Sequence, residues 1–231
     1  MKRLILCFLF LSLLAEGARA GVILGTSNPS GMPLIMSAGT TSGPMFVNVV
    51  SDNPPNDIMS GWNITLEISP VSGASGTLTF KDPATESPSN PPNYIFGGDG
   101  LGIFAANGGT TLVASDLFTG TTGGSVVPGT PGANLLQMDF LATSNASGLF
   151  GVYAVEGKAA TEWTDGNSNP QLFTNVPDTT GMVLIGEILI PQSVPEPSSL
   201  VLLGLGGAAI AGWQWQRKRS AARRPRWGEG N

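Results

Sequence analysis

The residues best suited to bind an ion lie in one short polar segment. Asp165, Asn167 and Asn169 carry side-chain oxygens at alternating positions. This spacing begins like a calcium loop, in which the side chains at positions 1, 3 and 5 converge on one ion. The pattern then stops, because position 6 is Pro170 instead of glycine and position 12 is Val176 instead of glutamate. We therefore expect a polar loop and no cofactor, with Ca²⁺ as the alternative that these oxygens leave open.

Acidic side chains nearby offer a second kind of chemistry. Glu156, Glu162 and Asp165 could supply the two carboxylates that most glycoside hydrolases use. Nothing in the sequence places two of them at a working separation, and loop acids are usually just solvated. Trp163 has polar neighbours and is the candidate for stacking on a sugar ring.

Two residue types that support catalysis are missing from residues 21–193. The chain has no histidine, and its single cysteine is Cys7. Ser-His-Asp and Cys-His hydrolase chemistry is therefore excluded, and the region is expected to fold without a disulfide. We predict a non-catalytic protein. The alternative is a secreted carbohydrate-active hydrolase or lyase that uses carboxylates.

The N-terminus is typical of a secretory signal peptide. Two basic residues precede an apolar run at residues 4–14, and Ala18 and Ala20 form the small-x-small pattern that signal peptidase reads. Cleavage is expected after Ala20, which makes Gly21 the first residue of the mature protein. The apolar run is too short to span a membrane, which takes about 20 residues.

The charges are segregated along the chain. Residues 21–193 contain thirteen acidic residues against Lys81 and Lys158, whereas residues 214–231 hold six basic residues and one acid. An acidic central region argues against nucleic-acid binding. A basic tail directly after an apolar segment is typical of a cytoplasmic stop.

Short apolar runs between turn residues fill the central region. In residues 62–68, Trp62, Ile64, Leu66 and Ile68 alternate with polar residues, which is the period of a half-buried strand. Glycine and proline clusters separate the runs. The pattern predicts an all-β domain over residues 21–193, an antiparallel β-sandwich or jelly roll. The expected strands are residues 45–50, 62–68, 77–80, 94–96, 102–105, 111–114, 135–142, 149–155 and 182–190.

Residues 194–231 carry the most specific pattern. Pro195, Glu196 and Pro197 precede an apolar segment at residues 200–213, which is followed by the basic tail of residues 214–231. This order resembles the PEP-CTERM sorting signal. The resemblance implies that an exosortase, a membrane cysteine protease-transpeptidase, is the partner that recognises the motif and cleaves near it.

The apolar segment is short for a permanent anchor. Its 14 residues would extend about 21 Å as a helix, against a hydrocarbon core of about 30 Å. We expect a short transmembrane helix that holds the protein in the inner membrane until the tail is cut. An ordinary anchor that is never cut is the alternative.

A looser resemblance covers residues 151–186, which look similar to the ends of exported PEP-CTERM proteins from planctomycete-like bacteria. Their sandwiches resemble cohesin and carbohydrate-binding modules, so a cohesin-like sandwich is included in the expected fold. The resemblances together imply a bacterial cell-surface or extracellular-matrix protein with a structural or adhesive role. Exopolysaccharide and biofilm matrix are the implied surroundings.

Overall fold

The computed structural model describes residues 21–71, 73–81, 92–192, 208–210, 213 and 215. The chain divides into two compact units, Met1–Gln192 and Ser193–Asn231. The predicted signal peptide, the sorting motif and most of the predicted anchor helix and basic tail lie outside the described residues. Residues 208–210, 213 and 215 are helical. None of the described residues forms a helix that is both long and apolar enough to cross a membrane.

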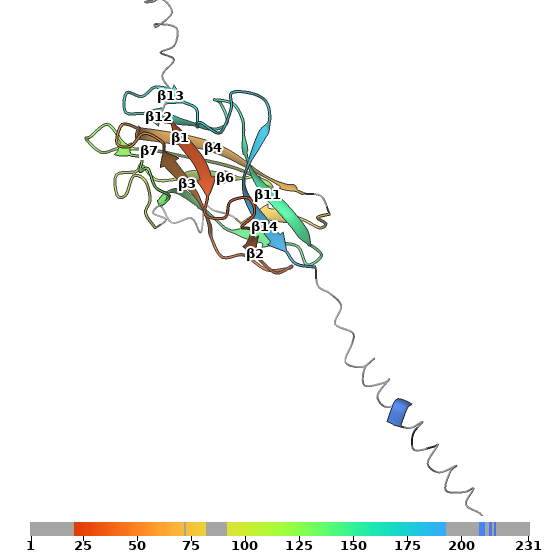
Figure 1. Cartoon of the computed structure of the whole chain (residues 1–231). Coiled ribbons are helices and arrows are strands. Elements are labelled where there is room, and N and C mark those ends of the chain that lie inside the picture. Colours follow the sequence, from red (N-terminus) through yellow and green to blue (C-terminus); the bar gives the residue numbers. More distant parts are fainter. Residues whose placement is uncertain are drawn as a thin grey trace, which may run out of the picture. The chain divides into compact units, whose positions relative to one another are not determined.

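Strands make up the described secondary structure of the first unit (Figure 1). They are β1 (Val22–Thr26), β2 (Leu34–Ile35), β3 (Met45–Ser51), β4 (Ile58–Pro70), β5 (Leu78–Phe80), β6 (Phe104–Asn107), β7 (Thr111–Leu117), β8 (Ser125–Val126), β9 (Ala133–Met138), β10 (Phe140–Ala142), β11 (Gly148–Val155), β12 (Glu162–Asp165), β13 (Pro170–Gln171) and β14 (Met182–Ile190).

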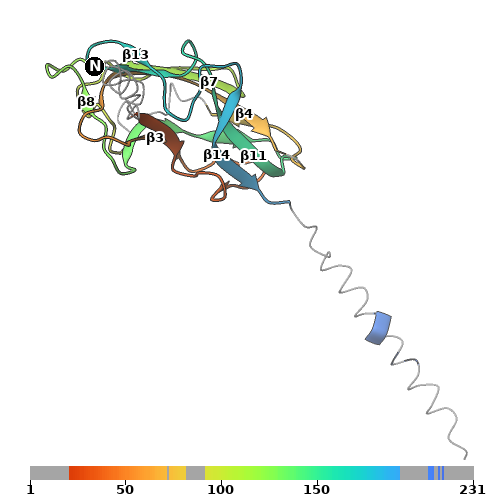
Figure 2. The same ribbon diagram turned by 45° about the horizontal axis from the view of Figure 1, so that its top comes forward.

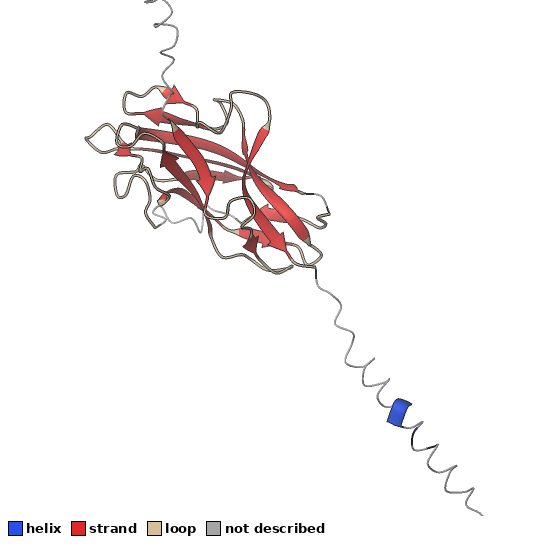
Figure 3. Ribbon diagram, viewed as in Figure 1, coloured by secondary structure: helices blue, strands red, loops and turns tan. Residues whose placement is uncertain are grey.

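These strands form a two-layered sandwich. The larger sheet has the order β13-β12-β4-β11-β14-β2, with β7 and β8 also paired to β4 and β6 paired to β7. There are two smaller sheets among the described strands. One has three strands in the order β1-β3-β9, and the other is the pair β10-β5. Figures 1 and 2 show β3 in a different layer from β4 and β7, and one hydrophobic core contains residues of all these sheets. The prediction of an all-β sandwich is confirmed (Figure 3).

Strand β4 is the longest, and its two faces have different surroundings. Trp62, Ile64, Leu66 and Ile68 are buried in the core, whereas the residues between them are half-buried on the opposite face. Successive side chains of a strand point to opposite faces of the sheet, so this alternation follows from the sequence. The prediction for residues 62–68 is confirmed, and pairing extends the strand in both directions.

Three strand predictions are wrong in detail. The strand expected at residues 102–105 is shifted, since β6 is Phe104–Asn107. Residues 94–96 form no strand, because Tyr94 makes only an isolated bridge to Asn134 and a turn follows. Their side chains are instead buried in the core, and the Tyr94 ring packs edge-on against Phe96. The predicted strand at residues 135–142 is interrupted at Asp139, so that β9 pairs with β3 and β10 pairs with β5.

Two neighbouring residues on β10 allow a matched test of the core. The Phe140 side chain is fully buried against Phe80, whereas Leu141 is 48% exposed. We expect Phe140→Ala to lower the free energy of unfolding by about 3–5 kcal/mol, since it leaves a cavity. Leu141→Ala should change it by about 0.5 kcal/mol or less. Denaturant unfolding measures both, and equal losses would contradict this assignment of the core.

Candidate functional site

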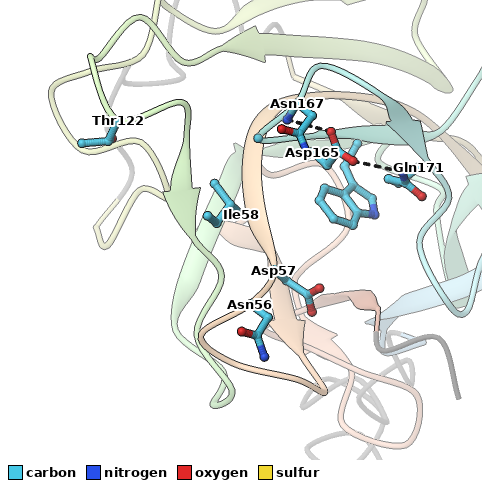
Figure 4. Close-up of a pocket in the computed structure, with 9 residues that line it drawn as sticks. Asn56, Asp57, Ile58, Thr122, Asp165, Asn167 and Gln171 are labelled. Carbon is cyan, nitrogen blue, oxygen red and sulfur yellow. Dashed lines mark hydrogen bonds between the residues drawn. The ribbon is translucent and has the colours of Figure 1, made fainter. Parts of the chain in front are cut away.

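A polar pocket of ≈ 340 Å³ brings together three loops and residues of β4, β12 and β13 (Figure 4). The residues that line it carry two carboxylates, three carboxamides and one threonine hydroxyl. The lining residues are Asn56, Asp57, Ile58, Thr122, Trp163, Asp165, Gly166, Asn167 and Gln171. Segments far apart in the sequence therefore meet here because β12 pairs with β4.

Asp165 organises the loop that follows β12. Its Oδ1 accepts hydrogen bonds from the backbone N–H groups of Asn167 and Asn169, both at 2.9 Å. Its Oδ2 accepts from the side-chain amides of Asn169 at 3.3 Å and Gln171 at 3.2 Å. The backbone hydrogen bond from Asn169 contributes most to lowering the pKa of Asp165 below its usual value. The carboxylate therefore stays ionised and is a poor general acid.

The geometry of this loop bears on the calcium hypothesis. Asp165, Asn167 and Asn169 do lie together, but the side-chain NH₂ of Asn169 faces the carboxylate. That orientation supplies a donor where a cation would need an oxygen. Across the described residues, no group of three or more histidine, cysteine, aspartate or glutamate side chains could hold a metal ion. The expectation of no cofactor, with Ca²⁺ as the alternative, stays a prediction.

The prediction of an open stacking face at Trp163 is wrong. Its side chain is only 6% exposed, and Nε1 donates a hydrogen bond of 3.1 Å to the carbonyl oxygen of Leu172. Trp163 takes the inward position of β12, where it pairs with Trp62 of β4. Its polar neighbours in the sequence belong to the other face of the strand, so they gave no information about the ring.

The pocket pairs different acids from those that the sequence suggested. Neither Glu156 nor Glu162 lines it, and Glu156 instead accepts a hydrogen bond from the Thr179 hydroxyl. The carboxylate that shares the pocket with Asp165 is Asp57, which accepts from the Ser51 hydroxyl at 2.5 Å. Sequence reasoning missed Asn56, Asp57, Thr122 and Gln171. The sequence does read Asn-Pro-Pro-Asn at residues 53–56, a turn pattern that could have indicated the loop before β4.

The candidate sorting residues Pro195, Glu196 and Pro197 follow the first compact unit, which ends at Gln192. They lie outside the described residues, as do the candidate cleavage residues Ala18 and Ala20. Residues 193–218 match the PEP-CTERM protein-sorting motif. The match includes all three residues of the predicted motif and the whole of the predicted apolar segment.

Comparison with solved structures finds similarity to cohesin modules. One is a type III cohesin from the cell-surface anchoring scaffoldin ScaE of Ruminococcus flavefaciens, with 9% identity and a TM-score of 0.48, covering 76% of this chain and 90% of that one. Another is the sixth cohesin of scaffoldin B from Acetivibrio cellulolyticus, solved with a dockerin, with 14% identity, a TM-score of 0.46 and coverage of 74% and 99%. No curated protein matches the sequence.

The lowered pKa of Asp165 gives a pH-dependent test of the loop. A depressed folded-state pKa stabilises the protein above the unfolded value of about 4, and this stabilisation is lost as the pH falls through the folded value. We expect Asp165→Asn to cost about 0.2–1 kcal/mol at pH 7, a small loss because the exposed carboxylate is screened by water. Unfolding curves at pH 7 and pH 2.5 measure the difference. A cost that is the same at both pH values would contradict the account.

Proposed function

We propose that this chain is an exported bacterial surface protein sorted by an exosortase, with a β-sandwich that acts as a non-catalytic adhesive module. The observation that supports the proposal best is the sorting-motif match at residues 193–218. It begins directly after the compact unit that ends at Gln192. A separate signal next to a complete folded unit is the arrangement that C-terminal processing requires.

The last strand makes such processing compatible with the fold. β14 ends at Ile190 and is paired with β11 on one side and β2 on the other. Ile188 and Ile190 are fully buried. A cut near Glu196 would therefore leave every described strand and every described core residue in the released part. The released sandwich would keep its stability after it leaves the membrane.

Changing the motif tests the sorting step. Glu196→Gln keeps the size of the side chain and removes its charge, so we expect slower processing and unchanged export. Ser198→Ala, just outside the motif, is the matched control. Immunoblots of membrane and surface fractions should show the longer membrane-bound form accumulating in Glu196→Gln and in an exosortase deletion. An identical full-length membrane band in all strains would show that the segment is a permanent anchor.

The polar pocket is the part of the sandwich that we assign to exopolysaccharide. Carboxylates and carboxamides can each form two hydrogen bonds with adjacent hydroxyl groups of a sugar ring. Both kinds of side chain line this pocket of ≈ 340 Å³. The Asp165 carboxylate is ionised and serves as an acceptor. An acidic domain repels acidic polymers, so the favoured ligand is a neutral or amino-sugar polysaccharide.

A carbohydrate-active enzyme is the second candidate, because Asp57 and Asp165 line the same pocket. Acid catalysis of glycoside cleavage needs one carboxyl group that holds its proton at working pH. The lowered pKa of Asp165 excludes that residue as the acid, so an enzyme would have to use Asp57 as the acid and Asp165 as the ionised partner.

One side chain separates the ligand site from the loop structure. The backbone N–H of Asn167 holds Asp165, and Asn167→Ala keeps that group while removing the amide from the pocket. We expect about tenfold weaker binding of purified exopolysaccharide by calorimetry, the loss of one or two hydrogen bonds. Asn145→Ala, an exposed asparagine outside the pocket, should bind normally. Equal affinities would contradict the site, and release of reducing ends that stops in Asp57→Asn would favour the enzyme.

A further inference from the structure

The backbone nitrogen of Gly21 lies against the side chain of Asp52. Gly21 N donates a hydrogen bond to Asp52 Oδ1 at 2.5 Å. In return, the backbone N–H of Asp52 donates to the Gly21 carbonyl oxygen at 3.2 Å. This exchange continues the antiparallel ladder one step beyond the Val22–Ser51 pair of β1 and β3. The carboxylate of Asp52 is thus aimed at one backbone atom, the nitrogen of Gly21.

Strand β1 is also held along its other edge. The backbone N–H of Thr174 donates to the carbonyl oxygen of Val22 at 2.8 Å. The side chain of Asn175 makes two hydrogen bonds with the backbone of Leu24, at 2.9 and 2.8 Å. Because both edges of β1 are paired, its register is determined. The position of the Gly21 nitrogen beside Asp52 therefore follows from the fold.

We infer that Asp52 is a binding site for the free α-ammonium group of the mature protein, formed when signal peptidase hydrolyses the Ala20–Gly21 bond. The inference rests on the proposed signal cleavage and goes beyond it. Hydrolysis consumes one water molecule, leaves a carboxylate on Ala20 and frees the Gly21 amine, which is protonated at neutral pH. An uncharged amide with one hydrogen becomes a cation with three. The hydrogen bond to Asp52 becomes an ion pair.

The surrounding charges decide how this group titrates. Gly21 and Lys158 line the same cavity of ≈ 280 Å³. Asp57, the residue just before β4, accepts the hydroxyl hydrogen of Ser51, which is next to Asp52 in the chain. Asp178 accepts a hydrogen bond from the backbone N–H of Lys158. Lys158 and the new ammonium carry like charges and repel each other. The carboxylate of Asp52, which is hydrogen-bonded to the Gly21 nitrogen, offsets this repulsion. Cleavage therefore adds stabilisation to β1 that the precursor lacks.

The sign of the pH dependence follows from the pair. A carboxylate beside an amine favours its charged form and raises its folded-state pKa above the ordinary value of about 8. The stabilisation is fully present below that ordinary value. It is lost as the pH rises through the raised folded-state value.

The reactivity of the α-amine tests the site in the full exported protein. Only the unprotonated amine reacts with an acylating reagent, and mass spectrometry of the N-terminal peptide measures the labelling rate at pH 7.5. We expect labelling to be about three- to tenfold faster in Asp52→Asn than in the natural sequence, which corresponds to a pKa change of about 0.5–1. Asp99→Asn is the control, because its exposed side chain lies in a different loop. Equal rates in all three proteins would overturn the inference.

Two further measurements separate this inference from the proposed processing. N-terminal sequencing that begins at a residue other than Gly21 would overturn both. A start at Gly21 with equal labelling rates would overturn the ion pair alone. In a variant with two serines inserted between Ala20 and Gly21, the charge is moved away from Asp52. Its melting temperature should fall below that of the natural protein at pH 6 and equal it at pH 10, and a difference that does not depend on pH would contradict the site.

Discussion

Burial of the inner face of β4 is the constraint on which the rest of the structure depends. This strand pairs with β7, β8, β11 and β12, and its apolar side chains face the core between the layers. A shift of one residue would turn Trp62 and Ile64 to the outer face and polar side chains into the core. The register of β4 therefore also places Asp57 and Ile58 at the polar pocket and draws β12 beside them.

The first and last strands of the folded unit are tied to each other. The buried hydroxyl of Thr26 on β1 donates to the carbonyl oxygen of Ile185 on β14 at 2.8 Å. A hydrogen bond inside a dry core is stronger than one at the surface. This hydrogen bond closes the described sandwich between its first and last strands. This arrangement suits a protein that is proposed to be cut at both ends.

The parts that could be predicted are those in which local pattern and burial agree. The alternation of residues 62–68 predicted β4 because one face of that strand lies in the core. The apolar run of residues 182–190 predicted β14, in which four consecutive residues are buried. Residues 94–96 are as apolar as a strand, yet they pack as aromatic side chains in a turn. Composition cannot distinguish these two ways of burying a side chain.

The pocket was predictable only in part. The alternating oxygens of Asp165, Asn167 and Asn169 did mark a structured loop, and the hydrogen bonds to Asp165 are its cause. Asp57 could not be found, since it lies more than a hundred residues away and joins the site through the pairing of β12 with β4. The polar neighbours of Trp163 misled for a related reason, because the inward or outward direction of a strand residue depends on which sheet covers it.

The intact mass of the protein recovered from the cell surface tests the central proposal most directly. A chain cut after Ala20 and near Glu196 would have a mass that matches residues 21 to about 196, with or without a group added at the new C-terminus. That result would agree with a sandwich released by processing at both ends. A mass that includes every residue through Asn231 would contradict it, since the C-terminal segment would then be a permanent part of the mature protein.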